Sequence, residues 1–394
     1  MKFDNVAIPA NLLWSSPFVR WQGELADVSS IDLAAAVTRR ALHDRGIGPD
    51  SIDEVVLGIT IPQPGSFFGP PTIAGRLGIP KITGPTVSQA CATSVAALHA
   101  AASSVALRGG TELVVTTDRT SNGPTIVYPS PAAAGGAPKV EDFVQSNFAR
   151  DPWAGTSMLT AAETVARERG IERAELDDVA ALRYEQYAQA LADDRRFQRS
   201  YMVPVEITVG RRRIDVAEDA GIRSIDRAAI TRLSPTVSDG VHTGASQTHP
   251  ADGVAGAVLS TTVHARDLGV GPVVQILATG FARVDATHMP EAPVPAALRA
   301  LESAGLTVGQ VDAITTHSPF AVNDVVFARE TGVDPATMNA YGCSLIWGHP
   351  QGPTGMRSIC ELVAELVQRG GGIGLFTGCA AGDTAGALVV RVDG

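Results

Sequence analysis

The chain has 394 residues, and its 31 Lys and Arg against 41 Asp and Glu give a formal net charge of −10. A chain of this length can bury a large hydrophobic core. It is too long to form one simple layer of secondary structure, so two or three subdomains are expected. The negative balance argues against a broad nucleic-acid surface, because phosphate contacts need an excess of Lys and Arg. An anionic ligand would need a local basic site.

The cysteines and the first residues predict a cytoplasmic protein with reduced thiols. Cys91, Cys343, Cys360 and Cys379 form no Cys-x-x-Cys pair, and in so long a chain they do not indicate a disulfide framework. The first residues carry an aspartate and a proline where a signal peptide needs an uninterrupted apolar run.

The first part of the chain predicts a strand, a helix and a second strand. Residues 52–61 have a β-branched apolar centre and lead into prolines, which is typical of a strand. From Cys91 onward, apolar residues at helical spacing predict a helix that ends at Arg108-Gly109-Gly110, and residues 113–117 resume as a strand. Polar residues interrupt the weakly polar stretch 87–107, so we expect a buried helix there and no membrane span.

The middle of the chain predicts an inserted covering region, or lid. Residues 124–138 are rich in proline and glycine, and charged helices follow around 161–169 and 173–193. The basic run 211–213 ends this part, where a solvated charged turn and a phosphate contact are equally consistent with the sequence. Such a change in amino-acid composition between two regions of regular secondary structure is expected of a lid.

The last part of the chain repeats the order of the first. Residues 311–316, 352–369 and 372–376 predict strand, helix and strand, and the helix again ends in Arg-Gly-Gly. This similarity predicts two related α/β units packed together, with the site at their junction. The expected division is 1–118 plus 250–270 for the first half, 119–249 for the lid, and 271–394 for the second half.

Two thiols and two imidazoles lie in separate turns marked by glycine, proline or small residues. Cys91 lies in Ser-Gln-Ala-Cys-Ala-Thr-Ser, His317 in His-Ser-Pro-Phe, His349 in Gly-His-Pro, and Cys379 in Gly-Cys-Ala-Ala-Gly. Together they would supply a nucleophile, its activator, a second proton-transfer group and an oxyanion donor. That set is suited to thioester chemistry.

At these motifs the chain resembles the thiolase family, the acyl-CoA acetyltransferases and 3-ketoacyl-CoA thiolases. The Cys91 block, residues 161–163 and 293–295, the His349 turn and the Cys379 block fall in thiolase order and spacing. The resemblance implies an α/β thiolase fold, with two related halves packed as a layered α-β-α-β-α core and an inserted lid. It also implies coenzyme A as substrate and product with no permanently bound cofactor, and assembly as a homodimer or homotetramer.

The resemblance implies a role for each reactive residue. Cys91 matches the nucleophile that takes the acyl group, and peptide dipoles at a helix N-terminus are expected to lower its pKa. His349 matches the histidine that activates this nucleophile. Cys379 matches the acid/base that removes a proton from the methyl carbon of acetyl-CoA. The backbone amides of Cys91 and of Ala381, an alanine where thiolases usually have glycine, would form the oxyanion hole.

The largest departure from the family pattern lies at His317. Many thiolases have Asn-Glu-Ala-Phe where this chain has His-Ser-Pro-Phe. Histidine occurs there in some branches, and it could donate directly to the enolate oxygen. The missing glutamate leaves the second cysteine without a usual orienting group, and Asn323 and Asp324 are the candidates to replace it.

Coenzyme A and acyl-pocket residues are also implied by the resemblance. Arg223 falls where thiolases place an arginine against the nucleotide end, and Thr248 falls at the position of a pantetheine-contacting serine. The candidates for shaping the acyl pocket are Met158, Met289, Trp347 and, in the lid, Trp153. No metal site is predicted, because no metal-ligand spacing joins His99, Cys343 and Cys360.

The leading hypothesis is a ping-pong Claisen condensation of an acyl-CoA with acetyl-CoA, or the reverse thiolysis, in lipid metabolism. A ketoacyl synthase-like condensing enzyme is one alternative, although it leaves Cys379 without a task. A thiolase-like subunit that is not catalytic or depends on a partner is another. A serine hydrolase and a nicotinamide enzyme are unsupported, because neither motif occurs.

Overall fold

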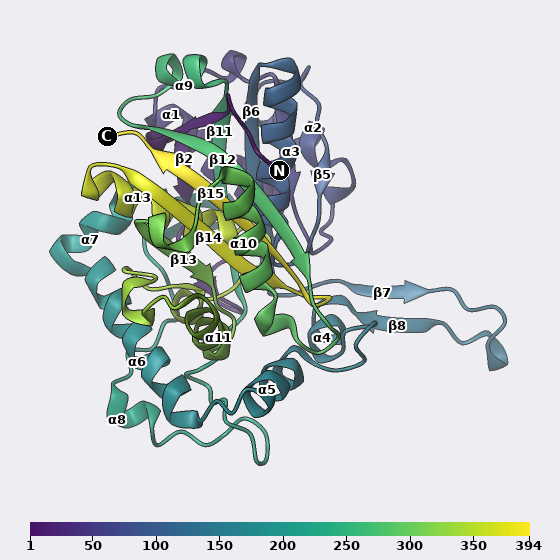
Figure 1. Cartoon of the computed structure of the whole chain (residues 1–394). Helices are drawn as coiled ribbons and strands as arrows, with labels where there is room; N and C mark the ends of the chain where they lie inside the picture. Colours follow the sequence, from purple (N-terminus) through teal and green to yellow (C-terminus); the bar gives the residue numbers. More distant parts are fainter.

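The structure, a computed structural model, describes residues 1–394 and is built from two mixed β-units (Figure 1). In the first unit, β4 (Glu54–Gly58) pairs in parallel with β6 (Thr111–Arg119) and with the short edge strand β5 (Thr86–Val87). Antiparallel to β6 runs β11 (Ala251–Ser260), which also pairs with β2 (Leu13–Ser15) and β3 (Val19–Arg20). Every residue of β11 is buried, as its run of Ala, Gly and Val requires.

The second unit repeats this arrangement and is joined to the first. Its strands follow the order β13 (Ala313–His317), β14 (Gly372–Ala380), β15 (Thr384–Val392) and β12 (Val273–Arg283). The pair β13 and β14 is parallel, whereas β15 runs antiparallel to both of its neighbours. The short strand β1 (Ala7–Pro9) pairs with both β11 and β12, so the two units form one continuous 11-stranded sheet.

Helices complete the layers on both sides of each unit. The helices α1 (Ser30–Asp44) and α2 (Gly69–Leu77) pack against β6 and β4, and α10 (Pro293–Ala304) packs against β12 and β15. Between the two units lie α3 (Thr93–Arg108) and α13 (Thr354–Arg369), which contact each other and strands of both halves. The observed α-β-α-β-α order confirms the predicted fold.

The two central helices end as the repeated Arg-Gly-Gly predicts. Gly109 follows α3 with a φ of 71°, and Gly370 follows α13 with a φ of 84°. Both glycines have a positive φ, which residues with a Cβ rarely adopt, and Gly370 has the left-handed helical conformation typical of a helix end. By length and composition alone residues 90–108 could cross a membrane, yet α3 packs against both halves of the sheet, as a core helix does.

The lid residues 119–249 fall between β6 and β11. They begin with the hairpin of β7 (Thr125–Tyr128) and β8 (Lys139–Asp142), which projects from the body of the molecule (Figure 1). The remaining elements are α4 (Phe143–Ala149), α5 (Met158–Glu168), α6 (Arg173–Ala190), α7 (Ala192–Arg199), β9 (Val205–Val209), β10 (Arg212–Val216) and α8 (Arg227–Ile230).

A buried ion pair ties the lid to the second half. Arg183 on α6 donates from Nε to Oδ2 of Asp324 at 2.9 Å, and both side chains are fully buried. Asp324 lies on α11 (Ala321–Thr331), which packs beside α10 and against α5 and α6. Two short helices complete the chain, α9 (Thr262–Leu268) beside β1 and α12 (Ser344–Trp347) before the His349 turn.

Candidate active site

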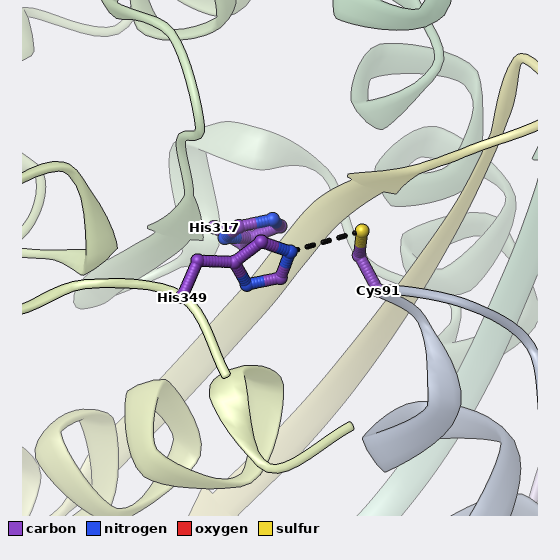
Figure 2. A group of neighbouring side chains, drawn as sticks. All are labelled: Cys91, His317 and His349. Carbon is purple, nitrogen blue, oxygen red and sulfur yellow. Dashed lines mark hydrogen bonds between the residues drawn. The ribbon is translucent and has the colours of Figure 1, made fainter. Parts of the chain in front are cut away.

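Cys91 and His349 form the centre of the site (Figure 2). The Nε2 atom of His349 lies 3.1 Å from the Cys91 sulfur, and its Nδ1 lies 2.6 Å from the hydroxyl of Thr354. When Nδ1 carries the proton and donates it to Thr354, the Nε2 lone pair faces the thiol. Burial lowers the pKa of His349 to about 3, so the imidazole is neutral at ordinary pH and can accept the thiol proton.

The turns that hold these two residues have constrained backbones. Gly348 has a φ of 95°, and a Cβ there would lie 2.9 Å from both the His249 ring and the Ala251 side chain. Only glycine therefore fits directly before His349. Ala90, directly before Cys91, is not a glycine yet has a φ of 44°, a strained conformation that presents the nucleophile at the start of α3.

Cys379 lies on strand β14, which pairs with the strand β13 that ends at His317. Its sulfur is fully buried and accepts a hydrogen bond from Nδ2 of Asn323 at 3.2 Å. Burial raises the pKa of Cys379 well above its ordinary range, and the nearby Cys91 sulfur raises it further. Cys379 follows Gly378, the β-sheet partner of His317, so strand pairing brings it to the end of the sheet where His317 lies.

His317 reaches the centre from the end of β13. Its β-sheet partner is Gly378, next to Cys379, and its ring lies 4.2 Å from that of His349 between centroids. Nδ1 of His317 lies 2.7 Å from the Ser344 hydroxyl, which accepts a hydrogen bond from the Ser318 N–H. The Ser344 hydroxyl can therefore donate its own proton to Nδ1 of His317. In that tautomer His317 carries its proton on Nε2, which has no hydrogen-bond partner.

The expected replacement for the missing glutamate is Asn323. Asp324, the other candidate, is occupied by Arg183 and by the hydroxyls of Thr316 and Ser318. Asn323 instead points its amide at the Cys379 sulfur, where it can stabilise a thiolate. Of the two candidates, Asn323 is therefore the one that contacts the Cys379 sulfur.

The predicted direction of the Cys91 pKa is wrong for the resting protein. The backbone amides of Ala381 and of Cys91 itself point at the sulfur and lower its pKa, as an oxyanion hole would. Burial is the larger effect and raises the pKa of Cys91 to about 12. The sequence could not reveal this because the depth of burial depends on the lid and on both halves.

Alkylation tests this protonation state. We expect the rate of Cys91 carboxamidomethylation by iodoacetamide to rise continuously with pH up to at least pH 10, since only the thiolate reacts. Mass spectrometry of the Cys91 peptide gives the rate at each pH. A rate that reaches its plateau below pH 8 would show a pre-formed thiolate and contradict the neutral Cys91–His349 pair.

A cavity of about 440 Å³ opens onto the Cys91 sulfur. Among the predicted pocket and coenzyme A residues, Thr248, Met158 and Met289 line it, together with His349 and Ala381. The rest of its wall is mainly apolar and comes from both the lid and the core: Ile61, Phe143, Val144, Phe148, Leu159 and Phe320.

Family models match almost the whole chain. The model described as "Thiolase, N-terminal domain" matches residues 14–262, and "Thiolase, C-terminal domain" matches residues 270–392. An acetyl-CoA acetyltransferase of Pseudomonas aeruginosa is 30% identical, over 95% of this chain and 96% of that protein. The chain belongs to the thiolase family of acyltransferases.

Solved thiolase structures share the fold from end to end. The acetyl-CoA acetyltransferase of Bacillus anthracis superposes with a TM-score of 0.89 and 25% identity, covering 99% of both chains. Human mitochondrial 3-ketoacyl-CoA thiolase in complex with CoA also gives a TM-score of 0.89, at 22% identity and over 99% of this chain.

Two residues predicted to surround the thiolase substrate lie outside the cavity. Trp347 is fully buried in the core, where its ring contacts Phe18 and lies 4.4 Å from the guanidinium carbon of Arg357. Trp153 is 71% exposed and lies beside Arg283. Arg223 is exposed and is not part of the cavity wall, so its contact with the nucleotide end of coenzyme A stays a prediction.

Two residues of this thiolase site escaped the sequence analysis. Gln351 has a φ of 69°, and its Oε1 lies 3.3 Å from the Cys91 sulfur, so it shares the thiol proton with His349. Asp118 accepts the N–H groups of Gly352 and Ile61 at 2.8 and 2.9 Å, which fixes the turn after His349 against the cavity wall. Gln351 lies two residues after His349 in the sequence Gly-His-Pro-Gln, and this closeness could have identified it as a site residue.

Proposed function

We propose that this thiolase condenses an acyl-CoA with acetyl-CoA, or cleaves a 3-ketoacyl-CoA with coenzyme A, through an acyl-Cys91 intermediate. The observation that carries the proposal is the meeting of Cys91, His317 and His349, whose donor atoms lie within 4.8 Å of one another, at the end of a cavity that Cys91 and His349 line. Cys379 follows Gly378, the β-sheet partner of His317, and so lies at the same end of the strands.

Acyl transfer to Cys91 is the first step. His349 Nε2 takes the thiol proton as the sulfur attacks the thioester carbonyl, over the 3.1 Å contact. The amides of Cys91 and Ala381 stabilise the oxyanion. The carbon–sulfur bond of the substrate then breaks, and His349 returns the proton to the departing coenzyme A thiol.

Carbon–carbon bond formation is the second step. Cys379, as thiolate, removes a proton from the methyl group of acetyl-CoA, and the Asn323 amide stabilises that thiolate before the transfer. The unpartnered Nε2–H of His317 donates to the enolate oxygen. The enolate carbon attacks the acyl-Cys91 carbonyl, the bond to the Cys91 sulfur breaks, and a 3-ketoacyl-CoA forms. The proton that Cys379 removed passes to the Cys91 sulfur, which restores the Cys91 thiol and the Cys379 thiolate for the next turnover.

The second cysteine separates this proposal from a ketoacyl synthase reaction. A decarboxylating condensation generates its carbanion by loss of carbon dioxide and needs no thiol base. Here Cys379 is buried in the centre and has a dedicated amide partner in Asn323. That arrangement favours proton abstraction from acetyl-CoA.

Substrate binding is assigned to the residues that line the cavity. We assign Thr248 to the pantetheine arm and Met158 and Met289 to the acyl group, and the presence of all three in the cavity wall supports this assignment. The structurally similar human mitochondrial 3-ketoacyl-CoA thiolase is in complex with CoA, which supports coenzyme A as the carrier for this chain. Arg223 is the proposed partner of its phosphate end.

Steady-state kinetics test the proposed function. Initial rates of acetoacetyl-CoA cleavage are measured at several fixed concentrations of coenzyme A. We expect parallel double-reciprocal lines, because the first product leaves before coenzyme A enters. Intersecting lines would contradict an acyl-enzyme, and absence of turnover across a panel of 3-ketoacyl-CoA esters would favour a subunit without activity of its own.

The hydroxyl of Thr354 is expected to hold His349 in the productive tautomer. Thr354→Val removes the 2.6 Å hydrogen bond at Nδ1 while keeping the side-chain shape, and we expect kcat/KM to fall about 10- to 100-fold. Thr354→Ser, which restores the hydroxyl, is expected to recover most of the activity. Equal activity of the valine and serine variants would contradict this role.

A further inference from the structure

His317 offers a ring nitrogen that no side chain uses. The residue is 1% exposed, and its Nε2 atom has no hydrogen-bond partner. An orphaned polar atom at this depth is costly and calls for a ligand. In both rings a hydroxyl lies within hydrogen-bond distance of Nδ1. When the His317 proton moves from Nε2 to Nδ1, where the Ser344 hydroxyl can accept it, Nε2 of His317 offers a lone pair as Nε2 of His349 does.

The two rings and the Cys91 sulfur form a compact donor set. Their donor atoms all lie within 4.8 Å of one another, and His349 Nε2 lies 3.1 Å from the Cys91 sulfur. Figure 2 shows the two imidazoles lying one behind the other on the same side of the sulfur. A tetrahedral zinc site separates sulfur and nitrogen ligands by about 3.6 Å and two nitrogen ligands by about 3.3 Å. Small side-chain movements would reach these separations.

We propose that Cys91, His317 and His349 form a binding site for Zn²⁺, and that its occupancy switches the thiolase off. One thiolate and two imidazoles are the ligand types that zinc prefers, and the fourth position opens to the substrate cavity. On binding, the thiol proton of Cys91 is released to solvent and the sulfur–zinc bond forms. The metal then covers the nucleophile and its activator at once.

The hydroxyls of Ser344 and Thr354 give this site its outer shell. Histidines that bind a metal normally anchor their second nitrogen to a hydrogen-bond acceptor, which fixes the ring and the tautomer. Ser344 and Thr354 hold the two Nδ1 atoms at 2.7 and 2.6 Å. Many thiolases, which carry asparagine at the position of His317, would lack the third ligand.

The metal site itself does not depend on the proposed thiolase reaction. The inhibition of turnover by the metal does rest on that proposed function.

Cobalt reports on the site without any turnover. We expect one Co²⁺ per chain, with a thiolate-to-cobalt charge-transfer band and the visible bands of a tetrahedral ion, both displaced by Zn²⁺. Cys91→Ala is expected to lose the charge-transfer band, and His317→Asn to weaken Co²⁺ binding at least about tenfold. Cys379→Ser and Cys360→Ser are expected to bind Co²⁺ as the natural protein does, because neither residue belongs to the donor set.

The cobalt results and the activity separate the two proposals. Spectra of Cys379→Ser that match the natural protein support the metal site even if no turnover is ever found. A charge-transfer band that persists in Cys91→Ala, or unchanged affinity in both His317→Asn and His317→Gln with native circular dichroism, would overturn it.

Inhibition is tested on the active protein. Micromolar Zn²⁺ is expected to abolish acetoacetyl-CoA cleavage, and a chelator to restore it. His317→Asn, measured relative to its own activity without metal, is expected to need at least about tenfold more Zn²⁺ for half inhibition. Equal half-inhibitory concentrations for the two proteins would contradict control of activity through this site.

Discussion

Cys91→Ala is expected to lower kcat/KM for 3-ketoacyl-CoA cleavage by on the order of 10⁴-fold or more, because no other group can carry the acyl chain. Gln351 and His349 both point at this sulfur, and neither can replace it as a nucleophile that forms a thioester. The measurement is the initial rate with acetoacetyl-CoA and coenzyme A for the variant and the natural protein.

The same chemical change elsewhere provides the control. Cys360 is buried on α13 and lies outside the cavity wall, so Cys360→Ala is expected to keep nearly normal turnover. Loss of activity in both variants would indicate general destabilisation. More than about one hundredth of the natural rate in Cys91→Ala would contradict the nucleophile assignment.

Cys379→Ala is expected to separate the two halves of the reaction. Exchange of the acetyl-CoA methyl protons with deuterated solvent should fall by about 10²- to 10⁴-fold, the usual contribution of a positioned base. Acyl transfer to Cys91 should survive, because His349 and the backbone amides that serve that step are untouched. Proton NMR of acetyl-CoA measures exchange, and intact mass measures acylation in the same sample.

Asn323 supplies a graded comparison for the second cysteine. Asn323→Leu removes the amide that points at the Cys379 sulfur and is expected to slow exchange by less than removal of the sulfur itself. Undiminished exchange in Cys379→Ala would mean that another group is the base. His317 would then be the first residue to examine, since its Nε2 is unpartnered at the same centre.

The sequence predicted those features of the fold that local patterns determine. Apolar periodicity placed the helix after Cys91, and each Arg-Gly-Gly marked a helix end because glycine readily adopts the positive φ found there. The ordered motifs predicted which four reactive side chains belong together. The approach of His317 to Cys379 required the strand pairing of His317 with Gly378, which no local pattern contains.

Features that depend on the packing of distant segments could not be predicted from the sequence. The Cys91 pKa depends on burial, which outweighs the local amides. Trp347 lies two residues before His349 in the chain, yet its side chain packs in the core, where the Arg357 guanidinium lies over its ring and Phe18 contacts it edge to face. The choice between Asn323 and Asp324 depended on Arg183, an ion-pair partner from a distant lid helix.

The central claim is that Cys91 carries the acyl group during the reaction, and detection of this acyl-enzyme tests it most directly. The natural protein is incubated with acetyl-CoA, its intact mass is recorded, and the modified peptide is sequenced by tandem mass spectrometry. One acetyl group on Cys91, removed again when free coenzyme A is added, is the predicted result. An active protein that shows no adduct under any condition, or that carries the acetyl group on another residue, would contradict the claim.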